Sequence, residues 1–361
     1  MRRLILKDTR SQPPQPPGAN ERVIIAVDLS RTKWVHACRW AGQEQRRVST
    51  PGELRHLQAL VSEYEHCKVE LIYEACGFGY EIAWWGQQRA IPVTVVAPST
   101  LEKAPGARVK TDGRDAGELA FRAERGMLKG IHIPSRPQHE YRQLSRTYTQ
   151  ALKDRKRQQV RIRLLLQEHG RVAPAGRRSW NEYTRWMATV SLPDSVASCV
   201  SELLELRHAA DRSVTRLANQ LRQLARLPPY KPLVKALCAQ AGIGSMTAIR
   251  FILEIGDIQR FATADSLVNY LGLTPSEYST GETIHRGRVR KCGPGFIRAW
   301  LVQCAWRAVN RGSDAALRDA FERIAARSGR KRAIVGVARR LALRLRARWL
   351  EFEDAQPMTA H

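Results

Sequence analysis

Apolar and polar positions give the first part of the chain a regular pattern. Short runs rich in β-branched residues alternate with segments of helical spacing up to about residue 137. The runs lie at 23–29, 33–40, 68–74 and 91–97, with helices expected at 54–67, 78–89 and 112–124. Runs of this length are typical of buried strands, and strands alternating with helices predict an α/β domain.

One helix start is marked by a specific signal. Thr50-Pro51-Gly52-Glu53 places a hydroxyl, a proline and an acid in the order of a capping box. We expect Thr50 to be the N-cap of the helix that follows it.

The pattern becomes helical after Pro137. Residues 139–170 are helical in spacing and strongly basic, and 194–226 carry apolar residues at steps of three and four. This predicts a coiled-coil hairpin or stalk, with a plain helical bundle as the alternative. The expected seam consists of Leu203, Leu206, Ala210, Val214, Leu217, Leu221 and Leu224.

The last third, from about 233 to 351, combines helices with one long loop. A Gly-Ile-Gly turn separates two helical patterns, a loop-rich stretch follows at 272–295, and helices are expected at 296–310 and 330–351. We therefore predict an α/β fold combined with all-α segments. The expected division is a proline-rich lead at 1–20, a first domain at 21–137, a coiled-coil stalk at 138–230, a helical C-terminal domain at 231–352 and a tail at 353–361.

The charge of the chain indicates what kind of partner it binds. The 361 residues include 60 Lys and Arg against 34 Asp and Glu, a net charge of +26, and 48 of the 60 cations are arginines. Because the planar guanidinium binds phosphate through two hydrogen bonds, this excess favours a nucleic-acid partner, without distinguishing DNA from RNA. The 43% hydrophobic content excludes a disordered basic tail protein.

Other classes of protein are excluded by what the sequence lacks. It contains no apolar stretch of membrane-spanning length, no signal-peptide pattern and no P-loop motif. The seven cysteines form no CxxC pair, which predicts reduced thiols rather than disulfides or a zinc site. We expect a cytoplasmic, nucleoid-associated protein with no membrane partner.

Four acidic residues stand against the prevailing positive charge. Asp28 and Glu74 end two predicted strands, and Asp112 and Asp115 begin a predicted helix three residues apart. Converging carboxylates are the ligands of paired magnesium ions in phosphoryl transfer. The alternative is that each acid is only a turn former or a helix cap.

Three stretches containing these acids resemble a known family. AVDLSRTKW, LIYEACGFGYE and KTDGRDAGELA are similar to motifs of the DEDD transposases of the insertion-sequence 110 family. The resemblance implies a RuvC-like, RNase H-fold catalytic domain. It also implies that Asp28, Glu74, Asp112 and Asp115 hold Mg²⁺, as a pair of ions.

The Gly-Ile-Gly turn is a candidate phosphate contact. Gly242 and Gly244 precede a predicted helix, as in helix-hairpin-helix DNA binders, where backbone amides receive a phosphate. An ordinary turn between helices is the alternative. The segment also resembles a P-G-I-G-x-x-T-A element of the family, with Ala241 in place of the proline.

The loop-rich stretch offers a nucleophile. The hydroxyls of Ser276, Ser279 and Thr280 precede a basic run of Arg286, Arg288, Arg290 and Lys291. A hydroxyl among cations suits attack on phosphorus, although an ST-turn followed by a phosphate-binding loop explains the spacing as well. The family places a nucleophilic serine in this loop. Its column is occupied by Thr280, whereas Ser279 is the less hindered alcohol, so both stay candidates.

These features together predict a DNA transposase or recombinase. It would cleave and rejoin strands through a covalent hydroxyl–phosphate intermediate. By resemblance, it would be guided by a structured bridge-type non-coding RNA and would act as a homodimer assembling to a tetramer. The alternatives are a metal-dependent junction-resolving nuclease without a covalent intermediate, and a nucleic-acid-binding protein without catalysis.

Overall fold

The computed structural model describes residues 16–98, 101, 112–176, 179–280, 283–289, 293–311 and 314–355. The chain forms two compact units, Met1–Arg136 and Pro137–His361. The finer division into five segments stays a prediction. None of the described helices is long and apolar enough to cross a lipid bilayer.

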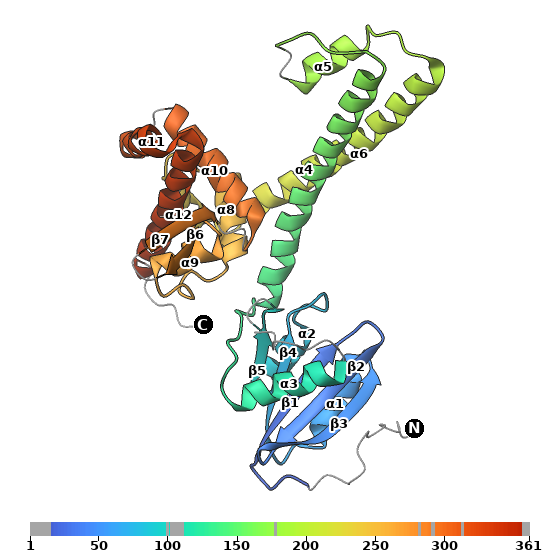
Figure 1. Ribbon diagram of the computed structural model, residues 1–361, viewed down its shortest axis with the longest axis vertical. Helices are drawn as coiled ribbons and strands as arrows, with labels where there is room; N and C mark the ends of the chain where they lie inside the picture. The colour runs from blue at the N-terminus through green and yellow to red at the C-terminus, as the bar shows by residue number, and fades with distance from the viewer. Residues whose placement is uncertain are drawn as a thin grey trace. The chain divides into compact units, whose positions relative to one another are not determined.

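The first unit is built on a five-stranded mixed sheet in the order β3-β2-β1-β4-β5 (Figure 1). β1 pairs with β2 in the antiparallel sense and with β4 in the parallel sense, and β4 pairs in parallel with β5. This topology is consistent with the expected RNase H-like sheet. The strands are β1 (Arg22–Leu29), β2 (Lys33–Trp40), β3 (Gln43–Pro51), β4 (Lys68–Glu74) and β5 (Val93–Val96).

Helices cover both faces of this sheet. α1 (Leu54–Ser62) and α2 (Glu81–Gln88) pack on the face that carries Val23, Ile25 and Val27 of β1. α3 (Asp112–Glu124) packs on the other face, against Ile24 and Ala26. Because successive residues of a strand point to opposite faces, the apolar run of β1 supplies both cores.

The expected cap at Thr50 is wrong. Thr50 lies in β3, is buried, and its hydroxyl is 2.8 Å from Nε2 of His36 on β2. Helix α1 instead begins after Glu53, which makes no side-chain capping bond. The capping pattern was a poor guide here because Thr50 already has a hydrogen-bonding partner inside the sheet.

The second unit begins with two long antiparallel helices, which we call the stalk (Figure 1). They are α4 (Arg136–Glu168) and α6 (Asp194–Leu224), with the short α5 (Trp180–Met187) between them. Of the expected seam residues, Val214, Leu221 and Leu224 are buried, the last two of them in the large core of the second unit, whereas Leu206 is 51% exposed. The neighbouring Arg207 lies seven residues from Val200 and from Val214, and it stacks on Trp180.

The rest of the second unit surrounds one large core, in which α12 packs against α7, α9, α10 and α11. The stretch expected to be a loop contains a hairpin of β6 (Pro275–Thr280) and β7 (Thr283–Val289), so this part is not wholly helical. The helices are α7 (Lys231–Cys238), α8 (Ser245–Ile255), α9 (Ala264–Tyr270), α10 (Gly295–Asn310), α11 (Ala315–Ser328) and α12 (Arg330–Asp354).

Candidate functional site

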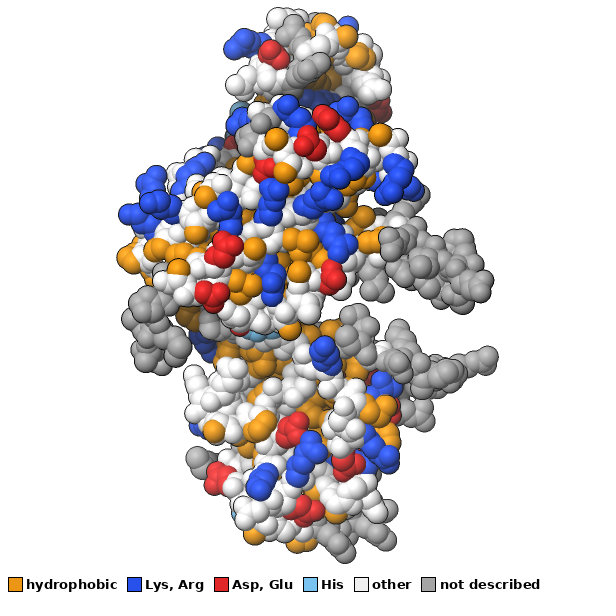
Figure 2. Space-filling view, turned by 90° about the vertical axis from the view of Figure 1, so that its left-hand side faces the viewer, with side chains coloured by type: hydrophobic (Ala, Val, Ile, Leu, Met, Phe, Trp, Pro, Cys, Tyr) orange, Lys and Arg blue, Asp and Glu red, His pale blue; other side chains and the backbone are white. Residues whose placement is uncertain are grey.

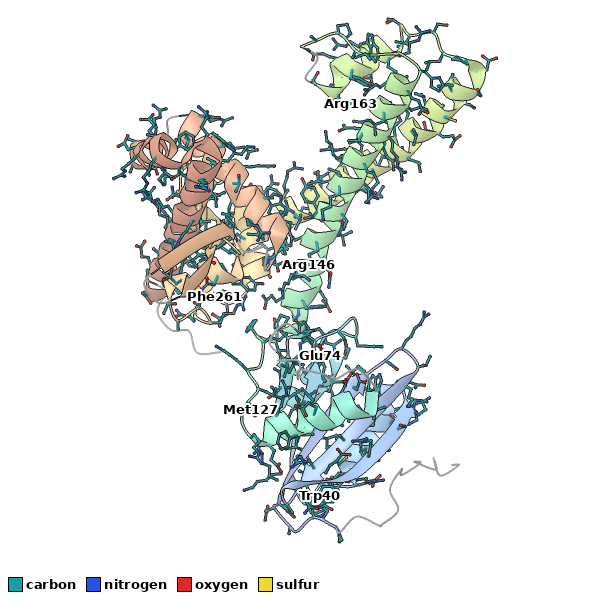
Figure 3. All side chains as sticks on the ribbon, in the orientation of Figure 1. Trp40, Glu74, Met127, Arg146, Arg163 and Phe261 are labelled. Atoms are coloured by element: carbon teal, nitrogen blue, oxygen red, sulfur yellow. The ribbon has the colours of Figure 1, made fainter. Side chains whose placement is uncertain are left out.

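Asp28 and Glu74 lie at the same end and on the same face of the sheet. Val27 of β1 is in register with Tyr73 of β4, so the next residue of each parallel strand is one of the two acids. Ile24 and Ala26 of β1 and Ile72 of β4 pack toward α3, and strand alternation places Asp28 and Glu74 on that face. Both are half-buried, and Figure 3 shows Glu74 at its end of the sheet.

The acidic start of α3 is directed toward this end. Glu124, its last residue, pairs at 2.6 Å with Arg39, which lies opposite Ile24 in the register of β1 and β2. The C-terminal end of α3 therefore lies toward the amino end of β1. Its first turn, which holds Asp112 and Asp115, is directed toward the end of β1 that carries Asp28.

The helical repeat relates the positions of these two acids to buried residues of α3. Ala116 and Leu119 are buried against the sheet, and they follow Asp112 and Asp115, respectively, by one helical turn. Asp115 is half-buried. The side chain of Asp112 lies outside the described residues. Among the side chains that are described, no three of His, Cys, Asp or Glu form a ready metal-binding group.

Ser279 and Thr280 lie at the far end of β6. In the hairpin register Ser279 is opposite Ile284, and Thr280 is opposite Thr283 next to the turn. Their side chains lie outside the described residues. Glu277, two residues before Ser279, is opposite Arg286 in the backbone register. Arg288 also lies on β7, whereas Arg290 and Lys291 lie outside the described residues.

The two glycines of the predicted turn have different roles. They lie between α7 and α8, as a helix-hairpin-helix arrangement requires. Gly242 has φ +84°, and a Cβ there would lie 2.6 Å from the carbonyl oxygen of Cys304 on α10. Gly244 is the N-cap of α8, and a Cβ there would meet open space. Close packing therefore accounts for the glycine at position 242. At position 244 the surroundings leave room for a ligand.

Basic side chains gather on one face of the second unit (Figure 2), and part of this charge has a structural use. On α12, Arg339 pairs with Asp265, Arg344 pairs with Asp314, and Arg346 donates to the carbonyl of Phe261. These arginines tie α12 to the start of α9, the start of α11 and the turn before α9. Some of the excess arginines therefore stabilise the fold, and their number alone does not measure nucleic-acid binding.

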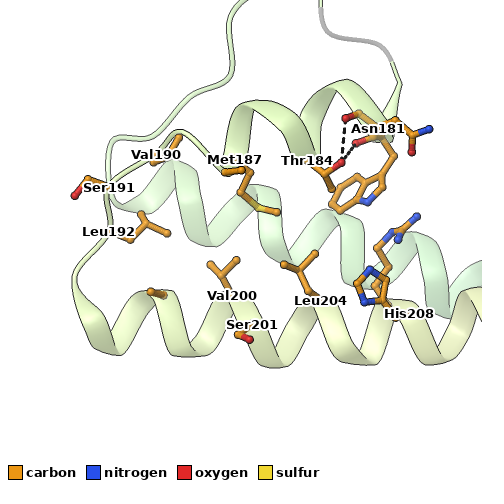
Figure 4. Close-up of a pocket in the computed structure, with 14 residues that line it drawn as sticks. Asn181, Thr184, Met187, Val190, Ser191, Leu192, Val200, Ser201, Leu204 and His208 are labelled. Atoms are coloured by element: carbon orange, nitrogen blue, oxygen red, sulfur yellow. Dashed lines mark hydrogen bonds between the residues drawn. The ribbon is translucent and has the colours of Figure 1, made fainter.

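A groove of about 740 Å³ lies at the end of the stalk, between α5 and α6 (Figure 4). Its walls are mixed, with the apolar Met187, Leu192, Val200 and Leu204 beside polar residues such as Thr184 and His208. It contains none of the residues that the sequence marks for catalysis. The candidate catalytic residues therefore lie at the carboxyl ends of β1 and β4, on α3 and on the hairpin, and not in this groove.

Sequence reasoning missed a buried polar group in the second unit. Glu254 on α8 is almost fully buried and is bonded by Arg142 and Arg146 of α4 and by Tyr270 of α9. Its sequence signal is a single acid within the apolar run FILEIG.

Comparison with known proteins places both units in one family. A DEDD transposase model of the IS110 type matches residues 25–170, and the model described as "Transposase IS116/IS110/IS902 family" matches residues 234–322. The y4qE protein of Sinorhizobium fredii, named as a transposase, is 29% identical over 78% of this chain and 70% of its own length.

Two further relatives agree with this assignment. The transposase for insertion sequence element IS1111A of Coxiella burnetii is 24% identical over 65% of this chain and 64% of its own length. The pilin gene-inverting protein of Moraxella lacunata is 28% identical over 62% of each chain. With family models matched on both units, and with the strand order of an RNase H-like sheet, the chain belongs to the IS110-type DEDD transposases.

Proposed function

We propose that this transposase cleaves and rejoins DNA by metal-dependent phosphoryl transfer through a covalent enzyme–DNA intermediate. The observation that carries the proposal is the placement of Asp28 and Glu74 side by side on one face of the sheet, with the acidic first turn of α3 directed toward the same end. The DNA-rearranging role follows from the family, and the residue roles below are the proposal.

The donor set fits magnesium. Asp28, Glu74, Asp112 and Asp115 offer only carboxylate oxygens, which are the ligands that Mg²⁺ prefers, and no cysteine or histidine is among them. A bound pair of ions would neutralise charge on the scissile phosphate. The four carboxylates lie on two strand ends and one helix. Because a core is packed on each side of the sheet, the spacing of these elements is fixed.

The proposed nucleophile is the Ser279 hydroxyl, with Thr280 as the alternative. In the step, the hydroxyl oxygen forms a bond to phosphorus and the bond from phosphorus to a sugar oxygen breaks. The hydroxyl proton passes to solvent, and the departing sugar oxygen takes up a proton. Because one phosphodiester replaces another, rejoining needs no ATP. The hairpin register supports it, because Arg286 is opposite Glu277, two residues from Ser279, and a guanidinium that close would contact the phosphate.

Guidance by a structured non-coding RNA, and assembly of dimers into a tetramer, complete the proposal. The net charge of +26, carried mostly by arginine, supports a partner with many phosphates. Recombining two duplexes requires two pairs of strands to be cut, which favours an assembly with several active sites.

The test is to trap the covalent intermediate. The protein is incubated with junction-containing DNA, the flanking non-coding RNA and Mg²⁺, then denatured and analysed for a protein–DNA adduct. We expect an adduct that requires Mg²⁺ and is lost in Ser279→Ala. Loss in Thr280→Ala with survival in Ser279→Ala would reassign the nucleophile. Free cleaved ends without an adduct would indicate a junction-resolving nuclease instead.

A matched pair of carboxylates tests the metal site. Glu74→Gln should abolish the adduct at unchanged DNA binding. Glu70→Gln is the control, because Glu70 lies on the same strand and pairs with Arg22 at the other end of the sheet. Equal adduct formation by the wild type, Asp28→Asn and Glu74→Gln would mean that these carboxylates only terminate strands and hold no catalytic metal.

A further inference from the structure

Two buried charges lie one helical turn apart on α8 where it meets the stalk. Arg250 and Glu254 are 4% and 1% exposed; Arg250 bonds to α4, and Glu254 bonds to α4 and α9. Charges buried this deeply are costly unless they are hydrogen-bonded, so their partners determine what they do.

Glu254 is the acceptor at the centre of this group. Arg142 donates to Oε1 of Glu254 through Nε at 3.1 Å and through Nη2 at 2.9 Å. Arg146 donates to the same oxygen through Nη2 at 2.9 Å, and Figure 3 shows it on the stalk helix α4. Two guanidinium groups on one carboxylate fix the rotation of α4 on α8 more tightly than apolar contacts would.

Arg250 adds a second anchor one turn earlier. It donates to the Ser145 and Thr149 hydroxyls of α4, and its guanidinium stacks on the ring of Tyr148 and on Trp300 of α10. The stalk helix is thus bonded to α8 over two successive turns.

Tyr270 extends this anchor to α9. Its hydroxyl accepts a hydrogen bond from Nη2 of Arg142 at 3.2 Å and donates to Oε1 of Glu254 at 3.4 Å. The ring packs 5.3 Å from that of Phe261 and carries the Arg260 guanidinium at 4.6 Å. The hydroxyl is therefore bonded to the stalk, while the ring is fixed by its neighbours.

The backbone of Tyr270 lies at the root of the β6–β7 hairpin. Tyr270 ends α9 five residues before β6 begins, and a Cβ on Gly293, four residues after β7, would lie 1.8 Å from the Tyr270 carbonyl oxygen. Arg298 of α10 donates to the next carbonyl, that of Leu271, at 3.2 Å. The chain entering the hairpin and the chain leaving it meet at this residue.

We propose that Tyr270 is a positioning residue, which holds the β6–β7 hairpin in a fixed orientation to the stalk through its bonds to Arg142 and Glu254. The inference rests on the proposed function, in that the hairpin carries the hydroxyl that attacks phosphorus. Without the Tyr270 hydroxyl, the last turn of α9 loses its bond to α4, and the hairpin can move away from the orientation that attack requires.

The test removes the hydroxyl and keeps the ring. Tyr270→Phe should slow adduct formation at saturating DNA by about 10- to 100-fold, which is the cost of a small misplacement of reacting groups. The DNA concentration for half-maximal adduct formation and the melting temperature should stay close to those of the wild type. Tyr230→Phe is the control, because Tyr230 packs against Tyr141 and is not among the described partners of Glu254.

Hydrogen exchange gives a readout that does not depend on the chemistry. In Tyr270→Phe, the amides of residues 276–289 should exchange roughly tenfold faster, since the hairpin has lost one attachment. Unchanged exchange together with an unchanged rate would overturn the positioning role and leave the proposed function intact. Adducts that persist in both Ser279→Ala and Thr280→Ala would overturn the nucleophile, while faster exchange in Tyr270→Phe would still show that Tyr270 holds the hairpin.

Discussion

His36 and Thr50 form a fully enclosed polar pair between β2 and β3, with Nε2 of the imidazole 2.8 Å from the hydroxyl oxygen. Both residues are buried, and Nδ1 of His36 has no hydrogen-bonding partner among the described residues. Burial, with a smaller effect from nearby His56, lowers the pKa of His36 from 6.5 to about 4. The imidazole is therefore neutral in the folded protein at neutral pH.

This pair predicts acid sensitivity of the first unit. The unfolded state takes up a proton near pH 6.5, whereas the folded state does so only near pH 4, so stability is full above 6.5 and falls as the pH drops toward 4. The loss attributable to His36 is about 3 kcal/mol. Denaturant unfolding at pH 7.5 and pH 4.5 should show this loss in the wild type and a smaller one in His36→Gln. The exposed His66→Gln is the control, and an equal pH dependence in all three proteins would contradict the prediction.

A second prediction compares two ion pairs on one helix. Asp314 pairs with Arg344 of α12 and also accepts from the Leu317 amide, so it caps α11. Asp265 pairs with Arg339 on the same helix but is 71% exposed, against 16% for Asp314. Asp314→Ala should lower the free energy of unfolding by about 2 kcal/mol, since a cap and a shielded pair are both lost.

The matched variant Asp265→Ala should cost less than about 1 kcal/mol, because an exposed pair gains little in water. Thermal or denaturant unfolding of the two variants measures the difference. Equal losses would mean that Asp314 acts as an ordinary surface charge. Desolvation opposes the effect, but the Leu317 amide and Arg344 lower the pKa of Asp314, so the advantage of the wild type over Asp314→Ala should decline as the pH falls through the acid range.

The glycine turn supplies a third prediction. Gly242→Ala should destabilise the second unit by about 1–3 kcal/mol, because φ is +84° and the added Cβ meets the Cys304 carbonyl. Gly244→Ala adds its methyl group in open space and should leave the melting temperature within about a degree. If the turn binds phosphate, Gly244→Ala should weaken DNA binding at unchanged stability. A stable Gly242→Ala variant would contradict the packing explanation.

The strands and the acidic residues of the first unit were predictable because burial leaves a direct pattern. β1 is apolar on both faces and β4 is apolar on one, and each ends near an acid. β3 was missed because it is an edge strand, where only Val48 and Thr50 are buried and charged residues fill the solvent face. A pattern method finds no alternation there, and Thr50-Pro51 then resembles a helix cap.

The sequence pattern also failed to predict the β6–β7 hairpin and the bonds of Arg250 and Glu254 on α8 to α4. β6 and β7 are polar strands that pair with each other, and they lack the apolar pattern of a buried strand. Glu254 joins α8 to partners more than a hundred residues earlier in the chain. The stalk seam failed at Leu206 because Arg207 has both a ring partner in Trp180 and an acid in Asp211. The i,i+4 spacing reveals Asp211, but local spacing does not reveal Trp180, which lies on another helix.

The interior of the stalk supplies the last prediction. Gln158 on α4 is buried, and its Oε1 has no hydrogen-bonding partner among the described residues. Ile162, one turn further along α4, belongs to the apolar core at the end of the stalk. An unsatisfied buried acceptor costs about 1–3 kcal/mol, and leucine has nearly the same volume without a polar atom. Gln158→Leu should therefore raise the free energy of unfolding by about 1 kcal/mol.

The control is Gln150→Leu, at an exposed position on the same helix, which should change the free energy of unfolding by less than about 0.5 kcal/mol. Denaturant unfolding of both variants measures the difference, and a destabilised Gln158→Leu would show that the amide oxygen is satisfied in solution.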